Sequence, residues 1–202
     1  MDINIFLNLA KTFSDNGYSL YMIGGTSRDY LLGIESADYD FVTDATPSET
    51  KTFLKDTINT FEKYGVLGYK VNGIHVDIVT LRKESNYLDS RHPKKIEFIK
   101  DLSVDYLRRD FTINAIYIDK DLKVIDFANG VEDLKNKIIR FIGDPLTRIK
   151  EDPLRILRAY RFQKKLGFKI EEETLKLMQE HEYLLENLNK DKIKEEERKA
   201  NK

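Results

Sequence analysis

The stretch that decides the fold runs from Tyr21 to Asp40 and reads YMIGGTSRDYLLGIESADYD. Its first three residues are apolar and typical of a short strand, and Gly24-Gly25 follows directly. Two glycines let the backbone approach a bulky anion closely, because no side chain stands in the way. Asp38 and Asp40 have the two-residue period of a strand, so we expect both carboxylates to point to one face. The stretch therefore predicts a strand, a phosphate-binding turn and a second, acidic strand.

The two acids suit a metal site beside the glycines. Hard carboxylate oxygens a few ångströms apart bind Mg²⁺, and waters and substrate phosphates fill its remaining positions. Glycines for a triphosphate next to carboxylates for metal ions describe a site of phosphoryl or nucleotidyl transfer. Each part alone also has an ordinary explanation, since Gly-Gly often forms a turn and paired aspartates occur in acidic loops. Their close spacing after an apolar strand favours the transfer site.

Composition limits the class of protein. The chain of 202 residues is long enough for one medium domain and a smaller piece. A hydrophobic content of 41% can build a core, and a net charge of −1 argues against a non-specific nucleic-acid coat protein. The absence of cysteine excludes a thiolate zinc site, and the three histidines are scattered. No apolar run approaches the roughly 20 residues of a membrane span. With no signal peptide at the N-terminus, we expect a soluble, cytoplasmic protein.

Helical and strand patterns are mixed up to about residue 143, and the pattern is helical beyond Asp144-Pro145. Periodicity predicts helices at 3–16, 27–32, 46–57 and from 104 to 115, and strands at 18–23, 39–43, 65–71, 74–81, 116–118 and 124–127. Asn72-Gly73 joins two of these strands and is a strong hairpin signal. The polar segment 83–95 predicts a mobile loop. We expect a mixed α/β head before about residue 143 and an all-helical part after it.

Three further motifs follow the first in a fixed order. They are RRDFTINA at 108–115, DFANG at 126–130 with Asp133-Leu134, and EDPLRILRAYRF at 151–162. Together with the glycines, Arg28-Asp29 and the two aspartates, this series resembles the class II (bacterial-type) tRNA nucleotidyltransferases and their poly(A) polymerase relatives. The resemblance extends over residues 18–190. One departure is Thr26-Ser27, where the family usually has small apolar residues, but both still fit a tight turn.

The resemblance implies an α+β fold with a nucleotidyltransferase-type mixed β-sheet flanked by helices, followed by a small all-helical segment. Residues 1–143 would form the catalytic head, and residues 144–202 the start of a helical neck that carries the nucleotide-reading helix. The implied activity is addition of C and A to the 3′ end of tRNA from CTP and ATP, with Mg²⁺ as cofactor. Poly(A) polymerase shares these motifs and stays an alternative. A nucleotide-binding head that is inactive without a separate tRNA-binding body is another.

The resemblance also assigns roles around the metal site. Asp38 and Asp40 would be the catalytic ligands of two Mg²⁺ ions, one activating the acceptor 3′-hydroxyl and one steadying the triphosphate. Asp77 is the candidate third acid, although a solvated strand residue is equally compatible. Gly24, Gly25 and Arg28 would meet the β- and γ-phosphates, since arginine offers planar, bidentate donors. The alternative for Arg28 is a surface ion pair with Asp29 or Glu35.

Arg109 and Asp110 would contact ribose and phosphate at the mouth of the same cleft, which would favour NTPs over dNTPs. The alternative is a capping arginine–aspartate pair on a helix. We expect Asn114 to be structural and to hydrogen-bond the backbone.

A helix predicted over about 150–165 carries the residues that would read the base. Asp152 and Arg155 are three apart and would be neighbours on one face, offering an acceptor beside a double donor. Cytosine and adenine both present an amine beside a ring acceptor, whereas guanine and uracil would meet the carboxylate with a carbonyl. Glu151 would buttress Arg155, and Arg158 and Arg161 would reach the triphosphate. The alternative is a solvated, salt-bridged helix.

Two further segments, 82–95 and 189–202, differ in how well they match the family. The segment 82–95 resembles its flexible catalytic loop, with Tyr87, Asp89, Arg91, His92 and Pro93 fitting well. The charged run at 189–202 stands where the family usually has an apolar-rich helix and then a body that holds tRNA. A truncated chain, a natural short form and half of a split enzyme all fit this run. The body would in each case be missing or a separate partner.

Overall fold

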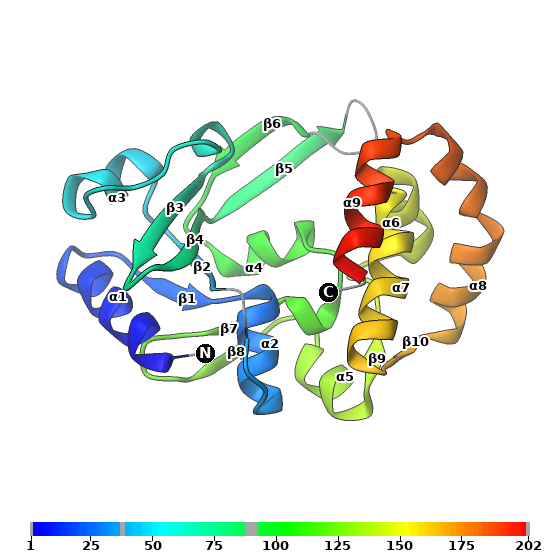
Figure 1. Cartoon of the computed structure of the whole chain (residues 1–202), viewed down its shortest axis with the longest axis horizontal. Helices are drawn as coiled ribbons and strands as arrows, with labels where there is room; N and C mark the ends of the chain where they lie inside the picture. Colours follow the sequence, from blue (N-terminus) through cyan, green and yellow to red (C-terminus); the bar gives the residue numbers. More distant parts are fainter. Residues whose placement is uncertain (1, 37–38, 88–92, 201–202) are drawn as a thin grey trace.

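The computed structural model describes residues 2–36, 39–87 and 93–200 (Figure 1). A mixed sheet of six strands lies at its centre, in the order β3-β4-β2-β1-β7-β8. Its strands are β1 Leu20–Met22, β2 Asp40–Thr43, β3 Val66–Val71, β4 Ile74–Thr80, β7 Ile116–Ile118 and β8 Val124–Asp126. The pairing of β2 with β4 is parallel, and the other pairings in this sheet are antiparallel. The predicted α+β class is confirmed.

Helices lie on both faces of the sheet and at one end of it. They are α1 Ile3–Asp15, α2 Gly24–Leu32, α3 Pro47–Phe53, α4 Leu102–Asp105, α5 Gly130–Asn136, α6 Pro145–Glu151, α7 Leu154–Leu166, α8 Glu172–Glu180 and α9 Lys190–Ala200. Short 3₁₀ helices are η1 Glu62–Tyr64, η2 Tyr106–Arg108, η3 Thr112–Asn114 and η4 Glu182–Asn187. The short strands β9 Ile138–Ile139 and β10 Lys169–Ile170 pair in parallel. In the part of the chain that the structure describes, no helix is both long and apolar enough to cross a membrane.

Burial of one face explains where the helices pack. The apolar stripe of α1, with Phe6 and Phe13, packs against Phe41 of β2 and Ile78 of β4. The residues between these on the strands, such as Val42 and Val79, therefore point to the opposite face, because successive strand residues alternate. That opposite face carries the cleft described below. Thr46 and Glu49 form a capping box that starts α3.

A second apolar cluster joins the two predicted parts of the chain. It contains Phe111 and Phe141 from before residue 143, and Ile156, Phe162 and Met178 from the helices after it. The predicted division at residues 143/144 stays a prediction. The helices α6 to α9 do form the predicted helical end of the molecule, to the right in Figure 1.

The structure corrects the prediction of a loop at 83–95. Strands β5 Arg82–Tyr87 and β6 Pro93–Phe98 pair as an antiparallel ribbon separate from the main sheet. A two-stranded ribbon has no core beneath it, so it needs no alternation of apolar residues, and the sequence lacks that signal. Asp89, Arg91 and His92 lie outside the described residues.

Two predicted helices are also wrong in part. The segment 104–115 is not one helix, because Asp110 bonds the N–H of Phe111 with its own side chain and Arg109 is extended. The predicted helix at 150–165 is two helices, α6 and α7, that meet at Asp152-Pro153. Proline lacks the N–H that a helix needs and moves the residue before it out of the helical region.

Candidate functional site

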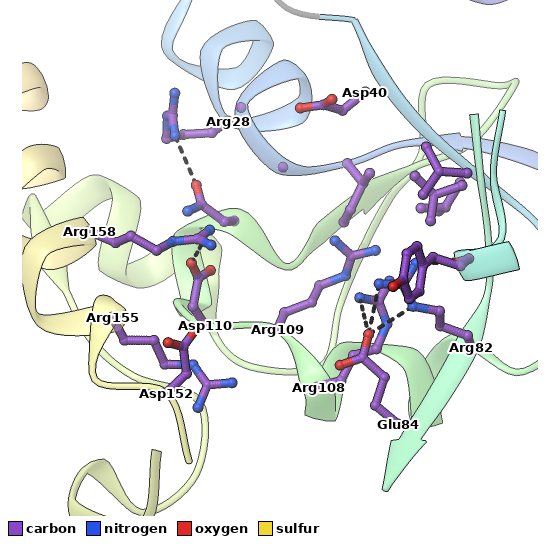
Figure 2. Close-up of a pocket in the computed structure, with 18 of the residues that line it drawn as sticks. Arg28, Asp40, Arg82, Glu84, Arg108, Arg109, Asp110, Asp152, Arg155 and Arg158 are labelled. Carbon is purple, nitrogen blue, oxygen red and sulfur yellow. Dashed lines mark hydrogen bonds and ion pairs between the residues drawn. The ribbon is translucent and has the colours of Figure 1, made fainter. Parts of the chain in front are cut away.

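A cleft of about 620 Å³ lies on the face of the sheet opposite α1 and reaches across to α7 (Figure 2). The described residues that line it include eight Lys or Arg and four Asp or Glu, an excess of four positive charges. Such a cleft attracts a polyanion. Predicted site residues on its wall are Gly24, Gly25, Arg28, Asp40, Arg109, Asp110, Asp152, Arg155, Arg158 and Arg161.

The glycine turn is the start of α2, so the helix begins before the predicted Ser27. Gly24 has a φ of +68°, which favours glycine. A Cβ on Gly24 would come within 3.4 Å of Asp40 Oδ2, so the turn and the carboxylate form one narrow cradle. Thr26 is fully buried, and its hydroxyl accepts the N–H of Asp40 at 2.7 Å. This contact explains why a polar residue stands at position 26, and the sequence alone did not indicate it.

The acids of the site come from two neighbouring parallel strands. Asp40 on β2 is paired in register with Asp77 on β4, and both alternate with core residues, so they share the cleft face of the sheet. Asp77 is half exposed, does not line the cleft, and lies 3.0 Å from His75 Nε2. Its role as a third acid therefore stays a prediction. Asp38 lies outside the described residues.

Within those same described residues, no cluster of three or more Asp, Glu or His could hold a metal ion. The chemistry of the donors still suits Mg²⁺. Asp40 offers hard oxygens in a cleft with excess positive charge, next to a turn that has room for phosphate. A site formed by one or two carboxylates and substrate phosphates is typical of this ion.

Arg28 is part of the buried wall of the cleft. Its Nε and Nη2 donate to Asp29 Oδ1 at 2.8 and 2.6 Å, and its Nη1 donates to Asn114 Oδ1 at 2.8 Å. The pair with Asp29 was an alternative from the sequence, but it is buried rather than on the surface. Asn114 bonds this side chain, where we expected a backbone partner. These bonds fix the direction of the guanidinium, which also lies over the ring of Phe162.

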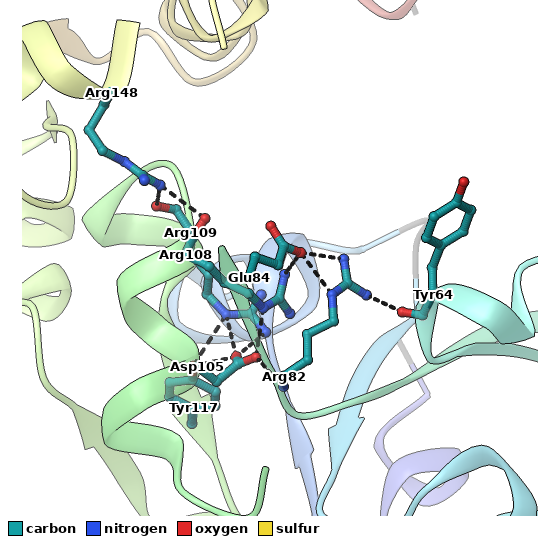
Figure 3. Close-up of polar contacts among 8 residues, drawn as sticks. All are labelled: Tyr64, Arg82, Glu84, Asp105, Arg108, Arg109, Tyr117 and Arg148. Atoms are coloured by element: carbon teal, nitrogen blue, oxygen red, sulfur yellow. Dashed lines mark hydrogen bonds and ion pairs between the residues drawn. The ribbon is translucent and has the colours of Figure 1, made fainter. Parts of the chain in front are cut away.

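The next cluster is centred on Asp105, which no motif in the sequence singled out (Figure 3). This fully buried carboxylate accepts bonds from Arg108 Nε at 2.8 Å, from Arg109 Nη2 at 2.8 Å and from the hydroxyl of Tyr117 at 2.8 Å. Burial alone would raise the pKa of Asp105, but Arg109 and Arg108 outweigh it and hold that pKa well below its usual range. Acid–base spacings of three and four residues were the available signal.

The same cluster fixes the charge and the orientation of the Arg109 guanidinium. Burial opposes its charge, but Asp105 outweighs this and raises the pKa of the guanidinium. Arg109 also lies over the ring of Tyr117, whose own pKa is raised by burial. Arg109 is thus a permanent, oriented cation on the cleft wall.

The ribbon β5–β6 is attached to this cluster through Glu84 (Figure 3). Glu84 Oε1 lies 2.8 Å from Arg82 Nε and 3.5 Å from Arg108 Nη1. Arg82 in turn donates to the carbonyl of Tyr64 at 2.6 Å, and its backbone N–H donates to Asp105. The base of the ribbon is therefore connected to the arginines of the cleft by ion pairs.

The break between α6 and α7 presents the predicted base-reading pair. Asp152 ends α6 in an extended conformation, and its Oδ1 accepts the N–H of Leu154 at 3.1 Å. Arg155 is buried, and its Nη1 donates to the Arg148 carbonyl at 2.6 Å and to Glu151 at 3.0 Å. The predicted buttress of Arg155 by Glu151 is confirmed. Asp152 and Arg155 both line the cleft, although not as neighbours on one continuous helix.

The two remaining arginines of α7 have acidic partners. Arg158 Nη2 lies 2.5 Å from Asp110 Oδ2, and this contact raises the pKa of Arg158. Burial alone would raise the pKa of Asp110, but Arg158 holds it below its usual range. Arg161 Nε lies 2.9 Å from Glu196 Oε2 of the last helix, α9. Contacts of these arginines with a triphosphate stay predictions.

Comparisons with known proteins agree with this geometry. The family described as Poly A polymerase head domain matches residues 20–140. The CCA-adding enzyme of Bacillus pumilus is 39% identical over 186 residues, which are 92% of this chain and 46% of that protein. The CCA-adding enzyme of Lactococcus lactis is 42% identical over 186 residues. The chain spans about half the length of the curated relatives it matches.

Solved structures of CCA-adding enzymes are also similar to this chain. The Bacillus stearothermophilus CCA-adding enzyme in complex with CTP superposes with a TM-score of 0.89 at 30% identity, over 98% of this chain and 48% of that chain. The Thermotoga maritima CCA-adding enzyme complexed with tRNA has a TM-score of 0.77, also at 30% identity, over 98% of this chain and 46% of that chain. With the family match over more than half of the residues, these findings lead to one conclusion. The chain belongs to the poly(A) polymerase head domain family, which the class II motifs predicted.

Proposed function

We propose that this chain is the nucleotide-transferring part of a CCA-adding enzyme, which extends the 3′ end of tRNA with C and A from CTP and ATP without a template. The observation that carries the proposal is one cleft that contains the Gly24-Gly25 turn, Asp40, and the Asp152–Arg155 pair. Curated relatives at about 40% identity are CCA-adding enzymes, which supports the same reading. Anion binding, metal ligation and base selection would then share a single space.

The phosphates of the nucleotide would lie against the start of α2 and the arginine wall. N–H groups at a helix N-terminus attract anions, and Gly24 and Gly25 let the phosphates come close. Arg28 and Arg109 are held by Asp29 and Asp105, so they are already oriented and lose little freedom on binding. Bound Mg²⁺, held by Asp40 and Asp38, would neutralise charge that develops on the triphosphate and lower the pKa of the attacking hydroxyl.

In the transfer step, the 3′-oxygen of the acceptor forms a bond to the α-phosphorus, and the bond from that phosphorus to the pyrophosphate oxygen breaks. The hydroxyl proton passes to solvent, and pyrophosphate leaves with its electron pair. The arginine wall stabilises the charge on the leaving group.

Selection of the base would depend on α6 and α7. The Asp152 carboxylate accepts from the exocyclic amine of cytosine or adenine, and Arg155 donates to the adjacent ring nitrogen. Glu151 and the Arg148 carbonyl fix the orientation of Arg155. Guanine and uracil would leave a buried acceptor facing the carboxylate, which costs about 1–3 kcal/mol for each unsatisfied group.

Incubation with tRNA that lacks its CCA end, Mg²⁺ and each labelled NTP in turn tests the proposal. We expect incorporation of C and A but not of G or U. In equilibrium binding with Mg²⁺, CTP and ATP should compete, and GTP and UTP should bind more weakly. Equal binding of all four nucleotides would exclude base reading by this site.

Poly(A) polymerase activity is a second candidate, because the matching family carries that description. The same incubation separates the two. Repeated addition of A alone to an RNA of any sequence would support the second candidate and exclude CCA addition.

A further inference from the structure

Phe61 and Tyr64 stand on the rim of the cleft, in the turn that leads into the edge strand β3. The side chain of Phe61 is 59% exposed, and within the described parts of the chain its ring contacts no other aromatic ring. Tyr64 is half-buried, and Lys63 Nζ lies 4.8 Å from the centre of its ring. Two aromatic side chains beside a cation therefore face a space that attracts polyanions.

The turn that presents these rings is firmly held. The N–H of Tyr64 donates to the Phe61 carbonyl at 2.9 Å, and Arg82 Nη1 donates to the Tyr64 carbonyl at 2.6 Å. Gly65 has a φ of +78° and lies against Phe98, where a Cβ would come within 2.7 Å of the ring. Lys51 Nζ lies 2.5 Å from Glu62. The exposure of Phe61 is thus a property of an ordered turn.

The order of strands puts this rim and the base-reading helix on opposite sides of Asp40. Phe61 and Tyr64 precede β3, and β4 separates β3 from β2, which carries Asp40. On the other side of β2 come β1 with the glycine turn and then β7, preceded by Asn114. Helix α7 is attached at that side, through Arg158 to Asp110. Figure 1 shows β3 and α7 on opposite sides of the molecule.

We propose that Phe61 and Tyr64 form a stacking platform for the terminal base of the acceptor RNA, an inference that rests on the proposed function. The attacking oxygen must lie in line with the leaving pyrophosphate, so the acceptor has to approach the α-phosphorus from the opposite side. The pyrophosphate would lie at the start of α2, next to β1, so the acceptor approaches from the other side of Asp40, where β4 and β3 lie.

The chemistry of stacking fits an acceptor whose last base changes after each addition. Aromatic side chains bind every base through its π-face and are tolerant of sequence. Single-stranded RNA ends are commonly bound by stacking of this kind. Lys63 and Lys165, near the two sides of the cleft, can contact the phosphates of the strand.

The test uses an RNA with 2-aminopurine as its last base, because stacking on an aromatic ring quenches its fluorescence. The full chain should quench this probe and should have little effect on the same probe placed five nucleotides from the end. Phe61→Ala should weaken binding of the RNA by about 5- to 150-fold, which corresponds to about 1–3 kcal/mol for one stacked base. Phe61→Leu should lose the quenching while keeping an apolar side chain, and Phe61→Trp should restore it.

Tyr183→Ala is the matched control, since Tyr183 is 58% exposed but does not line the cleft. It should bind the RNA as the unchanged chain does, and circular dichroism should match for all variants. Equal quenching by Phe61→Leu and the unchanged chain would overturn the platform. The affinities for CTP and for the other three nucleotides are measured in parallel. Equal binding of all four nucleotides contradicts the proposed function. Selective CTP binding without quenching of the RNA probe contradicts only the stacking platform.

Discussion

At the residue scale, Asp40 and Asp77 are the two described acids whose proposed metal-binding roles can be tested against each other. Both share one sheet face, but only Asp40 lines the cleft, and Asp77 is close to His75. We expect Asp40→Asn to lower transfer at least about 100-fold, because a metal ion supplies several kcal/mol of charge stabilisation in the transition state. Labelled CTP incorporation measures the loss, and circular dichroism checks the fold.

Asp77→Asn is the matched comparison. A loss as large as that of Asp40→Asn would identify Asp77 as the third acid, and unchanged transfer would identify it as a solvated strand residue. Substantial activity in Asp40→Asn would contradict the metal assignment itself.

Asp105 leads to a prediction about stability. Asp105→Asn keeps the shape but leaves Arg108 and Arg109 without their buried counter-charge, so we expect the free energy of unfolding to fall by about 3–5 kcal/mol at pH 7. Urea denaturation followed by circular dichroism measures it. Asp121→Asn, on an exposed carboxylate that pairs with the exposed Lys120, should change stability by less than about 1 kcal/mol.

The contribution of Asp105 should also depend on pH. Its pKa is lower in the folded chain than in the unfolded chain, where it is about 3.9. The stabilisation is therefore complete above about pH 5 and is lost progressively as the pH falls below about 4 toward the folded pKa. Denaturation curves at pH 7, 4 and 3 should show the difference between the unchanged chain and Asp105→Asn shrinking toward acid. A constant difference would mean that the stabilisation by Asp105 does not depend on the charge of its carboxylate.

At the element scale, the break between α6 and α7 determines where Asp152 lies. Pro153→Ala removes the steric restriction on Asp152, and the two helices can then join. We expect weaker discrimination between CTP and GTP, with the fold retained. Competition binding measures the ratio of the two affinities.

Pro145→Ala is the control for this change, since Pro145 is in the first turn of α6, where its missing N–H has no partner to lose. It should leave the CTP-to-GTP ratio unchanged. If both substitutions have the same effect, the break has no part in base selection.

At the scale of the whole molecule, the excess of positive charge in the cleft predicts the salt dependence of RNA binding. The residues that line the cleft carry four more positive than negative charges, and one phosphate contact for each would give a slope of about −3 for log K against log salt concentration with a single-stranded end, at about −0.7 per contact. A filter-binding titration with a tRNA acceptor end at several salt concentrations measures the slope. A slope near zero would show that phosphates are not bound in this cleft.

The last helix, α9, contacts the wall of the cleft from the far end of the chain. Glu196 of α9 is buried and contacts Arg161 of α7, while Lys199 lies 3.6 Å from the same carboxylate. The charged run at 189–202 therefore includes one residue with a structural partner on the cleft wall. Helical spacing, with Glu196 and Ile193 on one face, was the only signal available.

The sequence by itself determined the elements whose causes are local. The glycine turn, the Asn72-Gly73 hairpin, the Thr46–Glu49 capping box and α1 all depend on neighbouring residues, and the structure contains each of them. The motifs also identified the family and most of the cleft residues, because their order along the chain is itself specific. The predicted buttress of Arg155 by Glu151 held for the same local reason.

Only the tertiary structure decided the contacts between distant residues. Arg28 with Asn114, Arg158 with Asp110, and Glu84 with Arg108 are separated by many residues, and the sequence offers several acids for each arginine. Burial selects among them, because a charge removed from water must find the partner that the packing brings within reach. For the same reason the sequence pattern did not indicate the ribbon β5–β6: it lacks a strand-like alternation of apolar residues, and the described ion pair between Glu84 and Arg108 at its base joins residues distant in sequence.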